Sequence, residues 1–424
     1  MTAPRGAREL SRPAPGRPGP AYRGLPPLDR GTGTGRGIGE RLGGLVRRAF
    51  GRKSPLRQLD WILLATVLAL SLAGTLLVWA ATEPGLLHAG ADTRTYLIKQ
   101  LLNIGIGLAL MAGVAMLDYR QVRLYAPILY GLSCLGLLAV LTPLGSTVNG
   151  AFSWIALPGG FQIEPSEYAK LAIILMAAIL LSELRQGEQR PRLRAAGTGL
   201  ALAAVPIVLV EAEPDLGVVI LMLALIIGLI ALSGVRLHWL GAGLVAAALA
   251  VVAVLNLHLI RAYQLDRLTA FLHPSADPQG TGYSAAQAKI AIGSGGLLGQ
   301  GLFHGQLVSG NFVPEQHTDF IFAVAGEELG FAGCVVIIVL LAVVLLRALR
   351  IAARADDQFG MLVAAGVAIW FGVQSFVNIG MTMGIMPVTG LPLPFVSYGG
   401  SAMFADMIAV GALQAVYRHR AVFS

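Results

Sequence analysis

The sequence predicts an all-α integral membrane protein with about ten transmembrane helices. Of its 424 residues, 55% are hydrophobic and only 13% are charged, whereas about a quarter of the residues in a typical soluble domain are charged. Apolar runs long enough to cross a hydrocarbon core of roughly 30 Å recur along the chain. The cations between these runs are strongly biased to one side of the expected membrane. Together these observations exclude a water-soluble globule.

Residues 1–58 differ from the rest of the chain in composition. They contain 12 Gly, 8 Pro and 13 Lys or Arg, which leaves too few apolar groups to offset the entropy lost on ordering. We therefore expect a disordered basic cytoplasmic tail, followed by a multi-pass membrane domain over residues 59–424. An alternative for residues 38–50 is a short basic helix lying on an anionic leaflet, because apolar residues recur there at helical spacing.

Ten apolar runs are candidates for transmembrane helices. They lie near residues 59–82, 97–117, 122–142, 166–184, 197–212, 216–233, 239–260, 318–346, 360–383 and 398–417. Polar residues 211–215 separate the fifth run from the sixth, and they predict either a tight outer turn or a broken helix.

The distribution of cations predicts the orientation, because short loops rich in Lys and Arg stay in the cytoplasm. With the N-terminus inside, the tail and the inner loops hold 25 of the 31 Lys and Arg residues. Both the N- and C-termini are therefore expected in the cytoplasm. The large loop over residues 261–317, between helices 7 and 8, is then extracytoplasmic, as are residues 143–165 and 386–400. We expect the functional site on this outer side.

Ionisable side chains at membrane depth are costly, and they are therefore candidates for function. Glu167 and Lys170 lie three residues apart at the start of the fourth run, on one face of the expected helix. They predict either a structural ion pair that locks two helices together or a cation presented to an anionic ligand such as a diphosphate.

Asp319 ends a polar stretch and precedes apolar residues, which places a carboxylate at the outer border of the membrane. Such a group can act as a general base or hold a divalent cation. The alternative is that Thr318 or Asp319 only caps the following helix. Glu327 and Glu328 would lie roughly 12 to 14 Å deeper in that helix. We expect them, like Asp406, to be buried structural groups that face the bundle interior.

The glycine-rich run over residues 293–301 has two interpretations of equal weight. Its backbone N–H groups could cradle a phosphate, or its glycines could allow close packing of a re-entrant loop. An outer site with an acid, a lysine and apolar surface open to lipid suggests a substrate with an anionic head and a lipid tail. A glycosyl diphosphate lipid fits this description.

Five stretches between Leu59 and the C-terminus resemble the RodA/FtsW (SEDS) family of bacterial shape, elongation, division and sporulation proteins. They are FQIEPSEYAKLA (161–172), EPDLG (213–217), DRLTAFLHPSADPQGTGYSAAQAKIAIGSGGLLGQG (266–301), FVPEQHTDFIFAVAGEELG (312–330) and NIGMTMGIMPVTGLPLPFVSYGGSAM (378–403). The sequence GMTMGIMPVTG is more similar to RodA, the elongation member, than to FtsW, the division member.

The resemblance implies a peptidoglycan glycosyltransferase that polymerises lipid II into glycan strands at the outer face of the bacterial cytoplasmic membrane, for cell elongation and rod shape. It implies a class B penicillin-binding protein as the transpeptidase partner, within the elongation machinery. The family's catalytic aspartate falls on Asp319, and its functional Glu and Lys fall on Glu167 and Lys170. Further candidates for substrate binding in the matching stretches are Arg267, Lys289, His317 and Thr318.

The cofactor expected from this chemistry is a divalent cation, Mg²⁺ or Mn²⁺, with Asp319 as its candidate ligand. We expect no organic cofactor and no nucleic acid partner. Three alternatives stay open: a lipid II flippase, a division polymerase of the FtsW type, and a scaffold that only positions the penicillin-binding protein. The acids gather at the outer border and in the outer half of the expected membrane domain, which favours the enzyme over the flippase.

Overall fold

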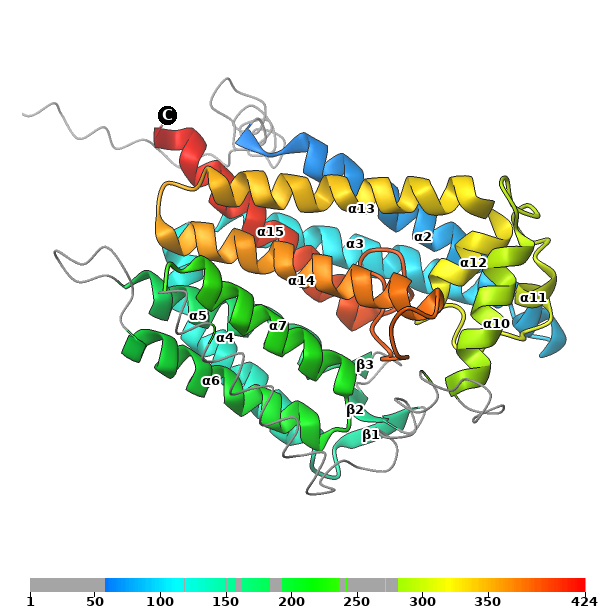
Figure 1. Cartoon of the computed structure of the whole chain (residues 1–424), viewed down its shortest axis with the longest axis horizontal. Coiled ribbons are helices and arrows are strands. Elements are labelled where there is room, and N and C mark those ends of the chain that lie inside the picture. The colour runs from blue at the N-terminus through cyan, green and yellow to red at the C-terminus, as the bar shows by residue number, and fades with distance from the viewer. Residues whose placement is uncertain are drawn as a thin grey trace, which may run out of the picture. The chain divides into compact units, whose positions relative to one another are not determined.

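The computed structural model describes residues 58–117, 119–148, 151–156, 162–183, 193–235 and 281–423, together with residues 241 and 271. Most of this part is helical (Figure 1). The predicted basic tail, the alternative helix over 38–50 and the predicted span over 239–260 lie outside the described residues.

The described elements are mainly α-helices, with one small sheet between α4 and α5. In chain order they are α2 (Trp61–His88), α3 (Thr95–Met116), α4 (Tyr119–Val140), β1 (Gly145–Val148), β2 (Ala151–Ala156), β3 (Gln162–Ile163), α5 (Pro165–Ser182), α6 (Leu193–Ala212), α7 (Leu216–Leu232), α10 (Thr281–Ser294), α11 (Gln306–Ser309), α12 (Ile321–Glu328), α13 (Gly330–Ala353), α14 (Gln358–Thr382) and α15 (Gly400–Phe423). Among these described helices, eight are long and apolar enough to cross a membrane, and α7 is a shorter apolar helix. The predicted all-α membrane domain is confirmed, while the count of ten spans stays a prediction.

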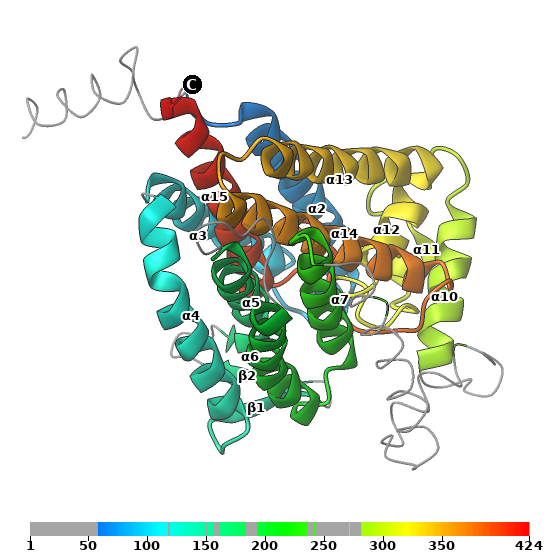
Figure 2. The same cartoon turned by 60° about the vertical axis from the view of Figure 1, so that its left-hand side comes forward.

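Polar residues between the apolar runs define where several helices begin. The side chains of Asp60, Asp215 and Asp357 each accept a hydrogen bond from the backbone N–H three residues on, at 3.0 to 3.1 Å, and so cap α2, α7 and α14. Pro165 stands in the first turn of α5, where its missing N–H costs no helical hydrogen bond. The polar stretch over 211–215 begins in the last turn of α6, and its residues 213–215 form a tight turn to α7, which packs against α6 (Figure 2).

Three helices form the centre of the bundle. In α5, α14 and α15, 72% of the membrane-length window is buried, against 28% in α3, α6 and α13. The outer faces of the peripheral helices are exposed and apolar, with leucines such as Leu124, Leu200 and Leu346 about half or more exposed. Such faces are expected where a helix contacts lipid rather than water.

A small antiparallel sheet stands in the segment between α4 and α5, which the sequence predicted only as an outer loop. Its strand order is β1-β2-β3, with Gly145 opposite Ile155 and Ile155 opposite Ile163. The sheet satisfies backbone groups that a loop of this length would otherwise leave to solvent.

The predicted eighth span over 318–346 is wrong in its first part. The chain forms two helices there, α12 and α13, with Gly330 at φ +67° between them. The short helix α12 packs with α10 and α2 at one end of the bundle, and α13 alone has membrane length (Figure 1). A left-handed φ favours glycine and interrupts an α-helix, which explains the break.

Glu327 and Glu328 are buried, as predicted, but not deep within a span. The Glu327 carboxylate accepts hydrogen bonds from the backbone N–H groups of Leu307 and Val308 at 2.8 and 3.0 Å, at the start of α11. The Glu328 carboxylate accepts one from Phe303 at 3.2 Å. Both acids therefore fasten the segment between α10 and α12, and the break before α13 is the reason that they lie beside this segment.

The glycine-rich run packs closely against the break between α12 and α13. A Cβ on Gly299 would lie 2.1 Å from the carbonyl oxygen of Glu328, and a Cβ on Gly330 would lie 2.2 Å from the nitrogen of Gly299. The backbone N–H groups of Gln300 and Gly301 donate to the carbonyls of residues 327 and 328. Close packing, rather than a phosphate cradle, therefore describes these residues.

We predict that Gly330→Ala destabilises the protein by about 1 to 3 kcal/mol. Alanine would be strained at this φ, and its Cβ would overlap Gly299. The matched control is Gly293→Ala, since a Cβ there meets no atom within 4 Å. Thermal unfolding of both purified variants in detergent measures the difference. Equal melting temperatures for the two variants would contradict the prediction.

Candidate functional site

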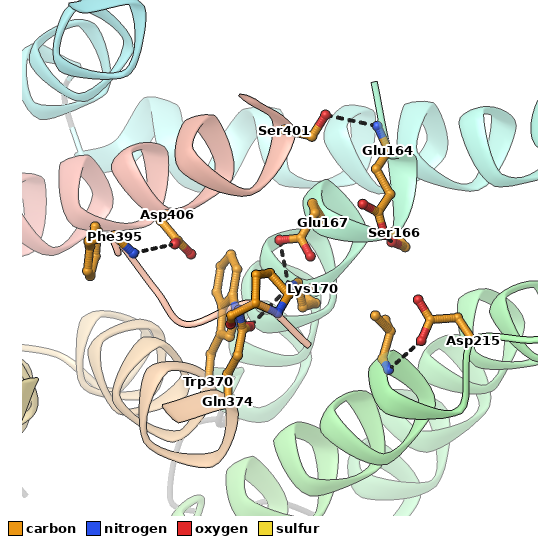
Figure 3. A network of polar contacts seen from close by, with 12 residues as sticks. Glu164, Ser166, Glu167, Lys170, Asp215, Trp370, Gln374, Phe395, Ser401 and Asp406 are labelled. Atoms are coloured by element: carbon orange, nitrogen blue, oxygen red, sulfur yellow. Dashed lines mark hydrogen bonds and ion pairs between the residues drawn. The ribbon is translucent and has the colours of Figure 1, made fainter. Parts of the chain in front are cut away.

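A fully buried ion pair lies on α5, and Lys170 links it to Gln374 on α14. Lys170 Nζ lies 2.6 Å from Glu167 Oε2, and it donates to Gln374 Oε1 at 3.1 Å (Figure 3). It also lies 4.8 Å from the centre of the Trp370 ring, whose Nε1 donates to the same Gln374 oxygen at 2.7 Å. We call Glu167, Lys170, Trp370 and Gln374 the ion-pair cluster.

The geometry of this cluster matches the structural alternative for Glu167 and Lys170. Both side chains are buried, with 1% and 0% of their surface exposed, and the ammonium group has an anion, an amide oxygen and an aromatic face around it. In this arrangement the lysine is not presented to a ligand from solvent. Direct contact of Glu167 or Lys170 with a substrate stays a prediction.

Further acids surround the ion-pair cluster. Asp406 on α15 is buried and faces the bundle interior, as predicted, and its carboxylate accepts a hydrogen bond from the backbone N–H of Phe395 at 3.3 Å (Figure 3). Glu164, just before α5, accepts one from the Ser166 hydroxyl at 2.9 Å. Burial raises the pKa of Glu164 well above its usual value, and the nearby charges of Glu167 and Asp215 raise it further.

Asp319 lies in a tight turn that precedes α12. The backbone N–H groups of residues 318–320 all donate to the carbonyl of Glu315, at 3.1 to 3.2 Å. The N-cap of α12 is Phe320, and no side chain caps it, so the alternative in which Thr318 or Asp319 is only a helix cap is wrong. The Asp319 side chain is half-buried. We call residues 315–320 the Asp319 segment.

Three hydrogen bonds hold the main chain of the Asp319 segment. The carbonyls of residues 317, 318 and 319 accept, in that order, from Tyr398 N at 2.9 Å, Ser397 Oγ at 2.6 Å and Asn378 Nδ2 at 2.8 Å. The donors come from α14 and from the loop over residues 385–399. These bonds restrain three consecutive peptide units, so a displacement of residues 317–319 would break at least one of them.

Two amides on α14 connect the Asp319 segment to the ion-pair cluster. Gln374 and Asn378 are one helical turn apart. Gln374 Nε2 donates to the carbonyl of residue 392 at 2.8 Å, and Asn378 Nδ2 donates to the carbonyl of residue 391 at 2.7 Å. A Cβ on Gly390, in the same loop, would lie 3.6 Å from Asp319 Oδ2. The 385–399 loop is thus fixed between the cluster on one side and the Asp319 carboxylate on the other.

The His317 ring belongs to an aromatic group beside the Asp319 segment. Its centre lies 5.3 Å from that of Tyr96 and 5.7 Å from that of Tyr398. Burial lowers the pKa of His317, although the nearby Glu315 carboxylate opposes this effect. The imidazole is therefore mainly neutral at pH 7, which makes it a hydrogen-bonding group rather than a cation. Substrate binding by His317 or Thr318 stays a prediction.

The remaining predicted site residues lie apart from these contacts or outside the described chain. Lys289 is exposed on α10, with its side chain against Gly384 at the end of α14. Arg267 lies outside the described residues. The sequence interpretation did not single out Gln374 or Asn378. The signal was available, since two amides four residues apart in an apolar run mark a polar helix face.

The described residues contain no preformed metal site. Within the described residues, no three His, Cys, Asp or Glu side chains come together in a way that could hold an ion. Asp319 could therefore contribute a single carboxylate, which is a common arrangement for Mg²⁺ because that ion keeps several waters and binds substrate phosphates.

A comparison with protein families identifies the chain. The FtsW/RodA/SpoVE model, described as a cell cycle protein family, matches residues 60–422. The chain belongs to this family. The match includes the ion-pair cluster, the Asp319 segment and the 385–399 loop.

Several relatives within the FtsW/RodA/SpoVE family have informative names. The peptidoglycan glycosyltransferase MrdB of Escherichia coli (strain K12) is 39% identical over 366 residues, which cover 86% of this chain and 95% of MrdB. A probable peptidoglycan glycosyltransferase FtsW of Trichlorobacter lovleyi is 37% identical over 362 residues, covering 84% and 93%. Stage V sporulation protein E of Bacillus subtilis is 37% identical over 363 residues, covering 85% and 97%.

Solved structures support the same fold. A chain from a peptidoglycan synthase complex, described for its coordination of polymerization and crosslinking, matches with a TM-score of 0.71 and 30% identity over 85% of this chain and 98% of that chain. The rod shape determining protein RodA of Thermus thermophilus matches with a TM-score of 0.62 and 29% identity, covering 85% and 97%. The chain is thus a multi-pass bacterial membrane protein.

We predict that Lys170→Ala lowers stability by about 3 to 5 kcal/mol, because it leaves the Glu167 carboxylate buried without its cation. The double variant Glu167→Gln with Lys170→Met should recover much of the loss, since neither buried charge is left. Lys99→Ala, at an exposed lysine, is the control. Melting temperatures in detergent compare the three variants, and a double variant less stable than Lys170→Ala would contradict the prediction.

A second prediction concerns Glu213, in the turn between α6 and α7. Burial raises the pKa of Glu213 to about 8, and the charge of Asp215 adds to the effect. Since this pKa lies above that of an unfolded glutamate, the native protein loses stability as the pH rises from about 4.5 towards 8. Glu213→Gln removes that loss. The melting temperature of the variant minus that of wild type should therefore increase from pH 5 to pH 9. A difference that is constant over this range would refute the assignment.

Proposed function

We propose that this chain is a peptidoglycan glycosyltransferase that polymerises lipid II at the outer face of the bacterial cytoplasmic membrane. The observation that carries the proposal is the 39% identity over 366 residues with a relative named for that activity. The site geometry supports it, because a half-buried carboxylate is held on a main chain that three hydrogen bonds restrain.

The reaction needs one proton acceptor at the reacting hydroxyl. That hydroxyl oxygen attacks the anomeric carbon of a lipid-linked sugar, and the bond between this carbon and the lipid diphosphate breaks with inversion. In our proposal the Asp319 carboxylate takes the hydroxyl proton, and the lipid diphosphate leaves with the bond's electron pair. Half-burial leaves this carboxylate reachable, while the restrained main chain limits the positions that it can occupy.

As an alternative to the proton-acceptor role, we propose that the Asp319 carboxylate would hold a divalent cation, Mg²⁺ or Mn²⁺, that offsets the charge of the substrate diphosphate. The donor set fits, since Mg²⁺ is often bound by one or two carboxylates together with phosphate oxygens. When bound, such an ion would offset the negative charge that develops on the departing diphosphate. The Asp319 segment supplies the ligand, and its three main-chain hydrogen bonds keep that ligand in place.

The proposed partner is a class B penicillin-binding protein that crosslinks the new strands. The similarity to a chain from a peptidoglycan synthase complex, with a TM-score of 0.71, supports this partner. The first of the reported relatives, MrdB, and the RodA structure favour a role in cell elongation and rod shape over one in division.

A lipid II flippase is the second candidate function. Transport across the bilayer would need polar groups that line a path to both faces. Among the described residues, the buried charges of Glu167 and Lys170 instead satisfy each other, and Gln374 completes the contacts of the ammonium. This closed arrangement favours the enzyme.

We predict that Asp319→Ala abolishes lipid II polymerisation, with a loss of at least about 100-fold, because the variant lacks the proposed proton acceptor or cation ligand. The assay uses the purified full chain with a cognate class B penicillin-binding protein, with and without EDTA. A melting temperature equal to that of wild type shows that the variant folds. Equal product from wild type and a folded variant would remove Asp319 from the mechanism, and activity unaffected by EDTA would remove the cation.

We also predict that Asn378→Ala lowers turnover by at least about tenfold while KM changes little, because the Asp319 main chain loses the amide that ties it to residue 391. Thr382→Val is the matched control. Thr382 lies one turn further along α14, and its hydroxyl donates only to its own helix. If both variants lose stability and turnover in parallel, Asn378 has no separate positioning role.

A further inference from the structure

A cavity lined by arginines lies far from the Asp319 segment, between the C-terminal parts of α13 and α15. One face of α13 supplies Arg347 and Arg350, the C-cap residue of α13 is Arg354, and α15 supplies Tyr417. The arginines are three and four residues apart, so helical periodicity brings all three to the same side of α13.

One of the three arginines is already neutralised. Arg347 donates from Nε to Asp60 Oδ2 at 2.7 Å and forms an ion pair with the same oxygen through Nη2. Asp60 is buried, caps α2 and accepts no other cation among the described residues. This pair therefore fixes the wall of the cavity and leaves its net charge to the other two arginines.

Arg350 and Arg354 keep their charge available. Both side chains are exposed, and within the described ranges neither forms a hydrogen bond or an ion pair. The acids that follow, Asp356 and Asp357, do not line the cavity, and Asp357 caps α14 through the N–H of Gly360. The cavity thus presents two cations and a phenol, a set of donors suited to an anion with several oxygen atoms.

The surroundings of the cavity point to the lipid leaflet as the source of that anion. The cation bias of the sequence predicts this end of α13 to be cytoplasmic, and α15 ends on the same side of the bundle (Figure 1). Leu346 and Leu349, one turn or less before Arg350, are 52% and 50% exposed. They offer apolar surface directly beside the cations, as an acyl chain joined to a charged headgroup would require.

We propose that this cavity binds the headgroup of an anionic phospholipid of the cytoplasmic leaflet. Arg350 and Arg354 contact the phosphate oxygens, the Tyr417 hydroxyl donates a further hydrogen bond, and an acyl chain lies over Leu346 and Leu349. Basic pockets between transmembrane helices on the cytoplasmic side are suited to such headgroups. The site does not depend on the proposed glycosyltransferase chemistry, since it contains none of the residues assigned to it.

The test measures the thermal stability of the purified full chain in a non-ionic detergent, as a function of added ligand. A ligand that binds only the native state raises the melting temperature with its concentration. The probes are dihexanoyl phosphatidylglycerol, dihexanoyl phosphatidylcholine, inorganic phosphate and oligoglutamate. The proteins are wild type, Arg350→Gln with Arg354→Gln, and the control Arg123→Gln, which removes an exposed arginine paired with Glu183.

We expect phosphatidylglycerol to stabilise wild type and Arg123→Gln equally, and to bind the double variant at least tenfold more weakly. Phosphatidylcholine should have no comparable effect on any of the three proteins. Equal stabilisation of wild type and the double variant, or equal effects of the two lipids, would overturn the proposal. Inorganic phosphate or oligoglutamate acting as well as phosphatidylglycerol, with the same arginine dependence, would also overturn it, in favour of a free anion or an acidic segment of a protein.

Discussion

The buried ammonium group of Lys170 needs an opposite charge and hydrogen-bond acceptors around it, and the packing of the central helices depends on this need. A charge removed from water is unfavourable unless an opposite charge and hydrogen-bond acceptors surround it. Glu167 supplies the charge from the same helix, but the acceptor and the aromatic face come from α14. The packing of α5 against α14 at the centre of the bundle is therefore a condition for burying this lysine, and the lysine in turn fixes how the two helices meet.

Gln374 extends this constraint beyond the ion pair. Its oxygen serves Lys170 and Trp370, and its nitrogen serves the carbonyl of residue 392, so the amide joins the buried charge to the 385–399 loop. Asn378, one turn further, joins the same loop to the Asp319 main chain. A disturbance at Lys170 can thus reach Asp319 through two amides on one helix face, without any direct contact between the two charged residues.

A second set of constraints acts at the end of the bundle that holds α10, α11 and α12. Here Gly299 and Gly330 have no Cβ, and this lets the two backbone segments pack closer than other residues would allow. The carboxylates of Glu327 and Glu328 accept hydrogen bonds from backbone N–H groups of the segment before α12. This end of the bundle is therefore held by backbone contacts and buried acids in addition to a small apolar cluster that includes Ala288, Val313 and Phe320. The break at Gly330 lets α12 remain at this end while α13 begins a span.

Much of the fold could be predicted because apolar length, cation bias and capping residues are local in the sequence. They placed most of the described membrane helices close to their observed bounds and identified Asp215 within a polar break, whereas α13 begins 12 residues later than the predicted span over 318–346. Glu167, Lys170 and Asp319 could be selected because a charge within or beside an apolar run is conspicuous. Their arrangement was decided by tertiary structure. The pairing of Lys170 with Gln374, the restraint of three carbonyls beside Asp319 and the helix break at Gly330 each depend on residues distant in sequence or on backbone contacts between segments, and no local pattern records which segments will meet.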